Sequence, residues 1–349
     1  AYRRIASPLP VAATFAQSAE PMVYLDTFMI GTPVSAPSRM HCGAFIRAGI
    51  FLASLCLGMA PALCVETTGA EDSVTLQKIS ATGVISIGYR EGSVPFSYLD
   101  ENHQPVGYSM DICNKVVEAL RKLLKLKTVT VRLAPMTPAT RVPLVANGTI
   151  DLECGVTTNT PERQKSVAFS VTTFVTESRL VSKRQAPIQR IDEMRGKAVV
   201  TTIGTTSMRN LNELNRSRQL GVEILAGRDD SDSFLMVVGG RAQGYAMDEV
   251  LLRSFIANAP QPNDYLISRD TLSVEPYGIM LNKDDPVFKQ AVDDAIVALF
   301  RSDEFADIYQ KWFQTPIPGQ GINLNLPMSE AFRKVIRHPT DSARPEDYR

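Results

Sequence analysis

The sequence predicts an α/β protein built as two lobes that are joined by two connectors, with a ligand cleft between the lobes. Two series of strand-like and helix-like segments follow one another along the chain, which is the rhythm of sheets covered by helices. A long β-like run at 174–183 separates the two series, and a second one at 270–281 follows them. We expect the chain to cross between the lobes at these two places. Because ligands of α/β sheets bind beyond the carboxyl ends of strands, the cleft should lie between the lobes.

The first series begins with a buried strand at 84–88. A helix follows at about 109–126, where apolar residues recur at spacings of three and four along one face. A strand at 128–133, a short helix at 141–146 and a strand at 151–156 complete the series. This order predicts a mainly parallel sheet covered by helices.

The second series repeats the alternation and supplies the rest of the expected architecture. Its strands are expected at 197–202, 222–225, 243–247, 265–267 and 277–281. Its helices are expected to begin near 205, 231 and 248, with two later helices at 286–300 and 302–313. The resulting division is lobe 1 at 74–175 plus 279–325, lobe 2 at 176–278 and a C-terminal tail at 326–349.

The beginning of the chain differs in character from the rest. From Met40 an apolar run of about a dozen residues leads to the small residues Ala60-Pro61-Ala62, which is the layout of a secretory signal peptide at 40–64. The run is too short to span a bilayer, and the alternative is a buried core helix. Residues 1–39 show no periodicity, so we expect a non-native or unstructured extension.

Charge and histidine content exclude several classes of function. Lys and Arg number 37, as do Asp and Glu, so no net field favours nucleic acid or an anionic membrane. The three histidines lie far apart in the sequence and in no metal-ligand spacing. We therefore expect neither a metal, nor a cofactor, nor a nucleic-acid partner.

Cysteine usage is consistent with export. Three of the five cysteines lie in the expected leader, which leaves Cys113 and Cys154. A disulfide between these two is compatible with an oxidising compartment. Two buried free thiols are the alternative.

Arginine and hydroxyl side chains stand at the ends of strands or the beginnings of helices, where the cleft is expected. The set consists of Arg90, Arg141, Thr157, Thr158, Arg163, Thr205, Thr206 and Asp248. Taken singly, each arginine is a candidate surface charge, and the threonines and Asp248 are candidate helix N-caps. Because they all stand on the same side of the inferred sheet, we expect them to belong to one site, and the hydroxyls and free backbone N–H groups at the helix start near Thr205 are suited to bind an anion. No nucleophile, phosphate-loop or zinc-protease motif accompanies them.

Several stretches resemble a known family. They are GYREGSVPFSYLD, PVGYSMDICNKVVEAL, NGTIDLECGVTTNTPERQKSVAFS, MRGKAVVTTIGTTS and YGIMLNKDDPVFKQAVDD. These segments are similar to the periplasmic glutamate/aspartate-binding proteins of ABC transporters, among the family 3 solute-binding proteins. The resemblance runs from about Val74 to Asp341. It implies the two-lobed periplasmic binding protein fold, with two connecting hinge strands and an inter-lobe cleft.

The resemblance also implies roles for individual residues. Arg163, helped by Thr158 and by Thr205 and Thr206, would clamp the α-carboxylate of an amino acid, and Asp248 would hold its α-ammonium. Arg90 and Arg141 would receive a side-chain carboxylate, and Phe96 and Tyr98 would form the cleft wall.

This chain departs from the family pattern at three positions. Pro138 and Val156 stand where serines are usual, and Asp230 stands where a histidine faces the side-chain carboxylate. Because Asp230 would repel a ligand carboxylate, it could neutralise an arginine and shift preference toward a neutral or amide side chain. The alternative is that Asp230 points to solvent.

The function that these features predict is capture of a polar amino acid by lobe closure and its delivery to an inner-membrane permease. Glutamate or aspartate is the first choice of ligand, and glutamine or asparagine comes next. The protein would be periplasmic and monomeric. The alternatives are a dehydratase-like periplasmic enzyme of the same fold and a ligand-sensing module.

Overall fold

A computed structural model shows the arrangement of residues 72–349. The chain divides into two units, Ala1–Leu63 and Cys64–Arg349, and the described residues all belong to the second unit. The extension at 1–39 and the signal peptide at 40–64 lie outside the described residues. Within these, no helix is both long and apolar enough to cross a membrane.

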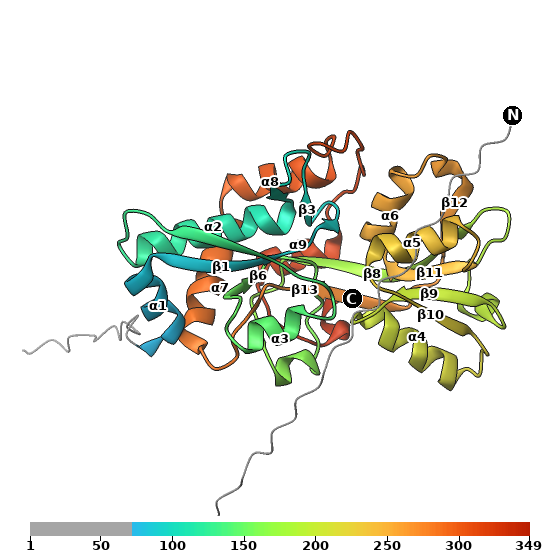
Figure 1. The fold of residues 1–349 in the computed structure, drawn as a ribbon, viewed down its shortest axis with the longest axis horizontal. Helices are drawn as coiled ribbons and strands as arrows, with labels where there is room; N and C mark the ends of the chain where they lie inside the picture. The colour runs from blue at the N-terminus through green and yellow to red at the C-terminus, as the bar shows by residue number, and fades with distance from the viewer. Residues whose placement is uncertain (1–71) are drawn as a thin grey trace, which may run out of the picture. The chain divides into compact units, whose positions relative to one another are not determined.

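Two sheets organise the structure, one in each lobe (Figure 1). The sheet of lobe 1 has the strand order β5 (Thr130–Pro135), β1 (Val84–Tyr89), β6 (Leu152–Glu153), β14 (Met280–Leu281) and β7 (Ala168–Phe169). The sheet of lobe 2 has the order β10 (Glu223–Gly227), β9 (Ala198–Thr202), β11 (Gly244–Asp248), β8 (Phe174–Lys183) and β12 (Tyr265–Ile267), and β13 (Ser273–Tyr277) also pairs with β8. A small third sheet joins β2 (Gly92–Ser93), β3 (Ser97–Leu99) and β4 (Pro105–Val106).

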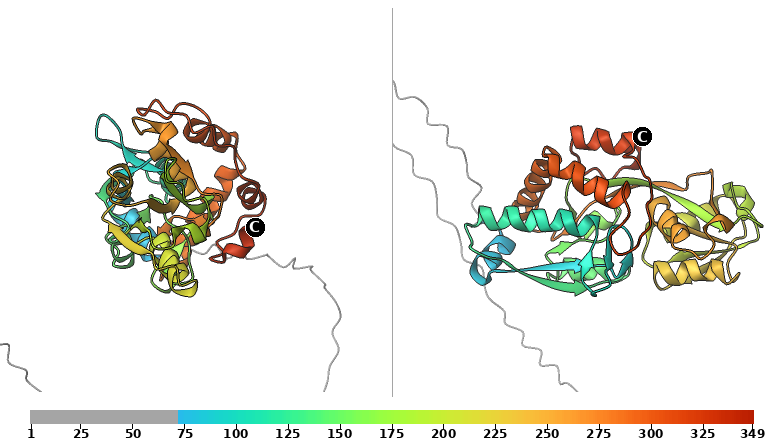
Figure 2. Two further views of the ribbon diagram at one scale, coloured as in Figure 1. Left: turned by 90° about the vertical axis from the view of Figure 1, so that its right-hand side faces the viewer. Right: turned by 90° about the horizontal axis from the view of Figure 1, so that it is seen from above.

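The two expected crossings are the antiparallel strands β8 and β13. Their register pairs Phe174 with Tyr277 at one end and Ser178 with Ser273 at the other. Figure 2 shows in its right-hand view how strands link the two groups of elements. The sheets are less parallel than expected: β1 is parallel to β5 and β6, and β9 to β10 and β11, but β14, β8 and β12 run antiparallel. Every antiparallel pair of the two main sheets involves β8, the first crossing strand, or β14, which follows the second one.

Helices cover both sheets. Those of lobe 1 are α1 (Val74–Thr82), α2 (Tyr108–Leu123), α3 (Arg141–Ala146), α7 (Pro286–Phe300), α8 (Asp303–Phe313) and α9 (Glu330–Arg337). Those of lobe 2 are α4 (Thr206–Ser217), α5 (Asp230–Val238) and α6 (Glu249–Ala257). Side-chain caps fix several of their starts: Thr205 accepts from the Met208 N–H at 3.2 Å, and Asp229 from the Asp232 N–H at 2.8 Å.

An aromatic cluster anchors both hinge strands to lobe 1. The ring of Phe96 lies 5.0 Å from that of Phe174 and 5.4 Å from that of Tyr277. The rings of Tyr108 and Phe313 each lie 5.0 Å from a neighbour in the same cluster. Because edge-to-face and offset pairs of this kind add to the stability that burial gives, the lobe 1 ends of β8 and β13 are firmly held.

The segment 326–349 is an ordered part of lobe 1 rather than a tail. Phe332 of α9 packs 5.6 Å from Phe174, and the 3-10 turn η5 (Pro345–Tyr348) adjoins β13. The Tyr348 hydroxyl bonds to that of Thr172 at 2.8 Å. Ser329 caps α9, and apolar residues on one helical face hold it to the lobe.

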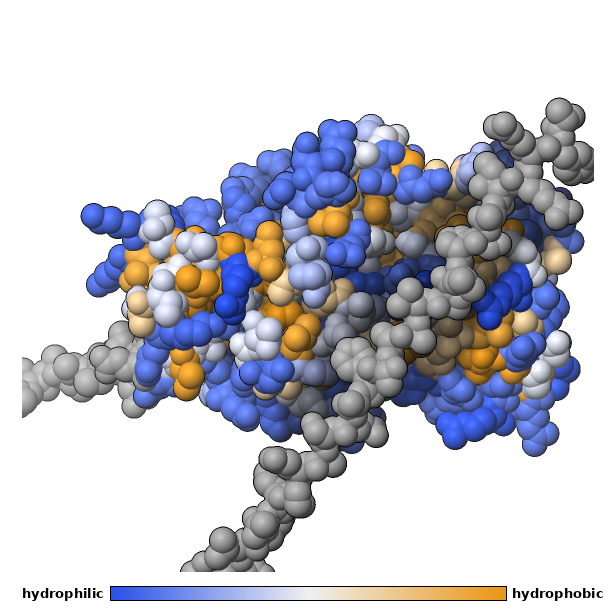
Figure 3. Space-filling model, in the orientation of Figure 1, coloured by the Kyte–Doolittle hydropathy of each residue, from blue (hydrophilic) through white to orange (hydrophobic). Residues whose placement is uncertain are grey.

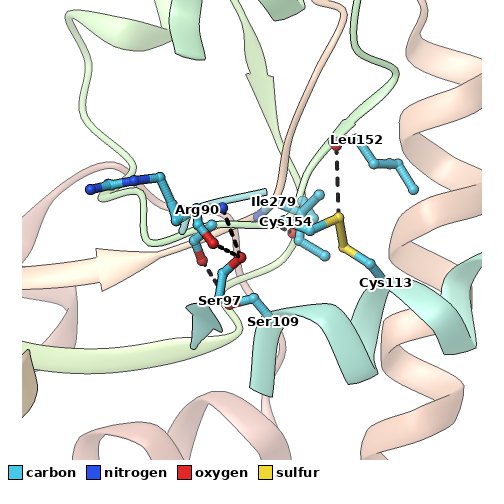
Figure 4. Close-up of a disulfide and its surroundings, with 9 residues drawn as sticks. Arg90, Ser97, Ser109, Cys113, Leu152, Cys154 and Ile279 are labelled. Atoms are coloured by element: carbon cyan, nitrogen blue, oxygen red, sulfur yellow. Dashed lines mark hydrogen bonds between the residues drawn. A yellow bond between two sulfur atoms is a disulfide. The ribbon is translucent and has the colours of Figure 1, made fainter. Parts of the chain in front are cut away.

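A disulfide links Cys113 of α2 to Cys154, which follows β6 (Figure 4). It settles the pairing that the sequence left open. In the close-up, the Arg90 guanidinium extends away from the disulfide, and the Ser97 hydroxyl accepts from the Arg90 N–H at 2.9 Å. The disulfide thus fixes Cys154, which lies two residues before Val156 and four before Thr158 in the chain.

The face shown in Figure 3 is covered mostly by hydrophilic residues, with hydrophobic ones in small groups between them. The most exposed large apolar side chains among the described residues include Val74, Leu123 and Leu235. They belong to three different helices, α1, α2 and α5.

Candidate functional site

Both lobes contribute to a cavity between strand ends and helix starts. Arg90 follows β1, Arg141 opens α3, Asp230 opens α5 and Asp248 ends β11. The residues that line the cavity are Arg90, Arg141, Val156, Thr158, Thr205, Thr206, Asp230, Met247, Asp248 and Leu251. Its volume is only about 10 Å³, and an opening of about 240 Å³ adjoins it at Arg90 and Asp230. The lobes are thus closed on each other, and an amino acid can reach the cavity only when they separate.

Arg141 is buried at the centre of this region. Its guanidinium donates to the Val156 carbonyl through Nη1, to the Thr157 hydroxyl at 2.6 Å, and to the Gly204 carbonyl at 3.4 Å. Its Nε has no partner among the described residues. Burial, and next the charge of Arg163, lowers the pKa of Arg141 to about 9, so that the side chain remains a cation at pH 7. The Nε–H group of Arg141 is therefore a donor that a ligand could engage.

Arg163 begins the 3-10 turn η2 (Arg163–Lys165) and does not itself line the cavity, but it bonds to Thr158, which does. It donates to the Thr158 carbonyl at 2.7 Å and, across the cleft, to the Gly204 carbonyl at 3.1 Å. Burial lowers its pKa. Both nitrogens that make these bonds donate to neutral carbonyls, and Arg163 forms no ion pair with any residue that the structure describes.

Gly204 of lobe 2 lies close to the backbone of lobe 1. A Cβ built on it would lie 2.7 Å from the carbonyl oxygen of Pro138 in lobe 1. Its φ of +79° is also a left-handed conformation that favours glycine. The proximity to Pro138 and the two arginine bonds make Gly204 one of the places where lobe 2 contacts lobe 1.

Asp248 presents an unsatisfied acceptor to the cavity. Its Oδ2 accepts from the Tyr277 hydroxyl, but its Oδ1 is buried without a partner among the described residues. Burial, and next the neighbouring charge of Glu275, raises the pKa of Asp248 well above its usual value. A ligand cation at this position would satisfy the oxygen and favour the ionised carboxylate.

Asp230 faces Arg90 rather than solvent. The Arg90 Nη2 lies 3.1 Å from Asp230 Oδ2, and the two residues are 5% and 2% exposed. The Ser93 hydroxyl donates to the same oxygen at 3.2 Å, and the Tyr245 hydroxyl lies 3.5 Å from Oδ1. Arg90 is therefore already neutralised by a partner from the opposite lobe.

The four threonines differ in what they do. Thr205 is the N-cap of α4, and Thr157 accepts from Arg141, so these two hydroxyls are engaged within the protein. Thr206 donates to Glu275 Oε2 at 2.7 Å, and its hydroxyl lies 3.5 Å from that of Thr158 across the cleft. Thr158 and Thr206 line the cavity where α4 begins, a position suited to a carboxylate.

Phe96 and Tyr98 do not form the cleft wall, which corrects the sequence-based expectation. Each is 1% exposed, and neither lines the cavity. Phe96 belongs to the aromatic cluster, and the Tyr98 hydroxyl donates to the Pro318 carbonyl at 2.7 Å while its ring contacts Trp312. Burying these aromatic rings in lobe 1 stabilises the folded protein, because it removes apolar surface from water that a position in the cleft wall would leave exposed.

Two buried acids were missed in the sequence. Glu153 on β6 is 1% exposed, both its oxygens lack partners among the described residues, and burial raises its pKa. Glu275 on β13 accepts from Thr206 and from the Ser273 hydroxyl. A charged residue inside an apolar strand, as in DLECG and SVEPY, was the signal that could have found them. No cluster of metal-ligating side chains occurs among the residues that the structure describes.

These features define a class of protein: two α/β lobes, two hinge strands and an inter-lobe site made of opposed charges. Residues 85–315 match the family model of bacterial extracellular solute-binding proteins, family 3. The chain belongs to that family.

Similar proteins include binders of acidic amino acids. The L-glutamate/L-aspartate-binding protein of Pseudomonas aeruginosa is 47% identical over 285 residues, which cover 81% of this chain and 93% of that protein. The glutamate/aspartate import solute-binding protein of Escherichia coli is 42% identical, over 82% of this chain and 96% of that protein.

Solved structures agree with the fold. A mutant of ArgBP from T. maritima superimposes with a TM-score of 0.62 at 26% identity, covering 69% of this chain and all of that one. An ancestral arginine-binding protein bound to glutamine gives a TM-score of 0.60 at 26% identity, covering 67% of this chain and 99% of its own.

Proposed function

We propose that this protein captures a free amino acid in the periplasm by closing its two lobes and delivers it to the permease of an ABC importer. The observation that carries the proposal is the pairing of opposed, incompletely satisfied groups in one closed cavity. Asp248 offers a buried free oxygen to an α-ammonium, and Thr158 with the beginning of α4 lines the same cavity at a position suited to an α-carboxylate. Arg163 adds a positive charge beside them, where it donates to the Thr158 carbonyl. Only a zwitterion supplies both charges.

The ligand group is supported by the relatives. The Pseudomonas and Escherichia proteins bear names that specify glutamate and aspartate. A more distant one, 24% identical, is named as a binder of glutamate, glutamine, aspartate and asparagine in Rhodobacter capsulatus. We therefore place the ligand among these four amino acids, and the choice between acid and amide depends on the side-chain end of the cavity.

Binding rather than catalysis follows from the chemistry of the cavity. Arginines and threonines act as charge and hydrogen-bond clamps, and Asp248 is occupied by Tyr277 on one oxygen. A catalytic role requires an acid and a base directed at a bond of the ligand. The proposed monomer binds, closes and docks on the permease by hinge motion of β8 and β13.

Thermal-shift screening of the purified protein against the twenty amino acids tests the proposal. A ligand at 100 times its Kd stabilises the native state by about 2.7 kcal/mol, which raises the Tm by several degrees. We expect a shift with members of this group of four and, by chromatography of the mixtures, no product. Asp248→Asn should abolish the shift; a folded wild-type protein that responds to no amino acid would refute the proposal.

A further inference from the structure

The side-chain end of the cavity balances its own charges. This inference rests on the proposed function, in which Asp248 and Arg163 are committed to the α-groups of the ligand. The buried cations that remain are Arg90 and Arg141, and the buried acids that remain beside them are Asp230 and Glu153. Arg90 is ion-paired with Asp230, and Arg141 already has Glu153 and Asp230 near it, so a side-chain carboxylate at this end would be the third acid beside two cations.

Breaking the Arg90–Asp230 ion pair so that a ligand can bind Arg90 is unfavourable. Its two side chains are almost completely buried, and Ser93 adds a hydrogen bond to the same carboxylate oxygen. Breaking one half of a buried pair leaves the other charge uncompensated, which is strongly unfavourable. Arg90 therefore remains bound to Asp230 when a ligand is present.

Two hydrogen-bonding groups of the cavity lining can bond to a ligand side chain, an unpartnered donor on Arg141 and a weakly bonded acceptor on Asp230. Arg141 Nε is a buried donor without a partner among the described residues. Asp230 Oδ1 is an acceptor whose nearest donor, the Tyr245 hydroxyl, lies at 3.5 Å and also contacts Thr202 at 3.0 Å. Both residues line the same cavity. A carboxamide has a carbonyl to accept from the arginine and an NH₂ group to donate to the aspartate, whereas a carboxylate has acceptors only and an ammonium has donors only.

We infer that Asp230 is a specificity-determining residue that makes the site prefer an amino acid with a carboxamide side chain, glutamine or asparagine, over the matching acid. The preference has two sources, since the amide adds no charge and can bond to both Arg141 Nε and Asp230 Oδ1. Discrimination of this kind is large because the rejected ligand leaves a buried donor or acceptor unpaired.

Calorimetric titration with four ligands, glutamine, glutamate, asparagine and aspartate, tests the inference. For the wild-type protein we expect Kd values at least tenfold lower for each amide than for its acid. In Asp230→Asn, the carboxylate is replaced by a group of the same shape, and the amide-to-acid ratio should shift at least tenfold toward the acid. Glu91→Gln is the matched control, because Glu91 adjoins the same opening but is exposed and belongs to no ion pair among the described residues. Its ratio should equal that of the wild-type protein.

A measurement on the wild-type protein alone keeps the inference testable if Asp230→Asn does not fold. Titrations in two buffers of different ionisation enthalpy report protons exchanged on binding. We expect glutamate to bind with more proton uptake than glutamine, since the added carboxylate must be neutralised. A tenfold preference of the wild-type protein for an acid, a preference for lysine or arginine, or equal proton exchange with glutamine and glutamate would overturn the inference and leave the proposed function intact. Failure to bind any amino acid would instead overturn the proposed function.

Discussion

The two faces of the cleft carry opposite charges. To the cavity lining lobe 1 contributes Arg90 and Arg141, whereas lobe 2 contributes Asp230 and Asp248. One contact between the faces is complete, because Asp230 pairs with Arg90 at 3.1 Å. Another is incomplete, because Asp248 keeps a buried free oxygen. The two acids therefore differ in role. The Arg90–Asp230 pair stabilises the contact between the lobes, whereas the unpaired oxygen of Asp248 requires a cationic group of the ligand.

Replacing Asp248 by Asn should have the largest effect on affinity. The change removes the charge that would face the ligand ammonium and keeps the shape of the side chain. Loss of one partner of a buried charge pair costs about 2–5 kcal/mol, so calorimetry should show a loss of about 30-fold or more for every amino acid. Asp264→Asn, at an exposed position of lobe 2, is the control and should bind as the wild-type protein does. An equal loss in both variants would contradict the role of Asp248.

Gly204→Ala should weaken binding by blocking the meeting of the lobes. The added Cβ would lie 2.7 Å from the Pro138 oxygen, so we expect about tenfold or greater loss of affinity, measured by calorimetry. The radius of gyration of the liganded variant, measured by small-angle X-ray scattering, should exceed that of the liganded wild-type protein. Gly221→Ala is a matched control, since Gly221 also has a positive φ, +62°, but no atom lies within 4 Å of the position that an added Cβ would take. If both variants bind alike, strain and not closure explains the loss.

Lowering the pH should weaken ligand binding by at most about tenfold per pH unit. The pKa of Asp248 is raised by burial, so in the free protein the carboxyl holds a proton over a range in which an exposed carboxyl has lost it. A ligand ammonium requires the ionised form, and binding below that raised pKa must release the proton. Calorimetry across pH should show affinity increasing with pH until this pKa is passed. Affinity that is constant from about pH 4 to about pH 8 would contradict the buried environment of Asp248.

The same raised pKa values act on stability with the opposite sign. Burial raises the pKa of both Asp248 and Glu153 in the folded protein. Such acids stabilise the folded state below their unfolded pKa, and this contribution is lost as the pH rises through the folded pKa. The Tm of the unliganded protein should therefore fall over the range in which affinity increases.

Removing the disulfide should leave affinity unchanged within about twofold. The link joins α2 to the chain after β6 and closes a sequence separation of 41 residues, so the double variant Cys113→Ser, Cys154→Ser should lose about 2–4 kcal/mol of stability. Denaturant unfolding measures the loss, and reductant should have no further effect on the variant. A large loss of affinity at a temperature where the variant is folded would show that the disulfide shapes the cleft.

Much of the fold could be predicted because its periodic segments are long. The helix α2 and the crossing strand β8 carry enough residues to show their periods, and the expected bounds agree within a few residues. The strands β2 and β4 are two residues long and have no period to detect. The helix α9 had detectable signals, Ser329 as a cap and an apolar face, but the neighbouring prolines and glycines masked them.

Some residues of the site could be predicted from the sequence and others could not, depending on whether their position follows from the order of strands and helices. Arg90, Arg141, Asp230 and Asp248 stand at ends of elements, and topology alone brings such ends together. Phe96 was wrongly expected in the cleft wall, because the sequence does not show whether its side chain faces the cleft or the core of lobe 1. Buried acids such as Glu153 depend on tertiary contacts, which have no local pattern.

Trp312 gives the molecule a built-in optical reporter. It is the single tryptophan of the chain, it lies in α8 of lobe 1, and its indole N–H donates to Asp111 at 2.7 Å. Its ring contacts Tyr98 of β3, which pairs with β2, and β2 carries the Ser93 that bonds to Asp230 of the opposite lobe. A change in the emission of this fluorophore on ligand addition would therefore come from lobe 1 beneath that hairpin. Constant emission during a titration that calorimetry shows to saturate would mean that lobe 1 moves as a rigid body and that only the hinge strands bend.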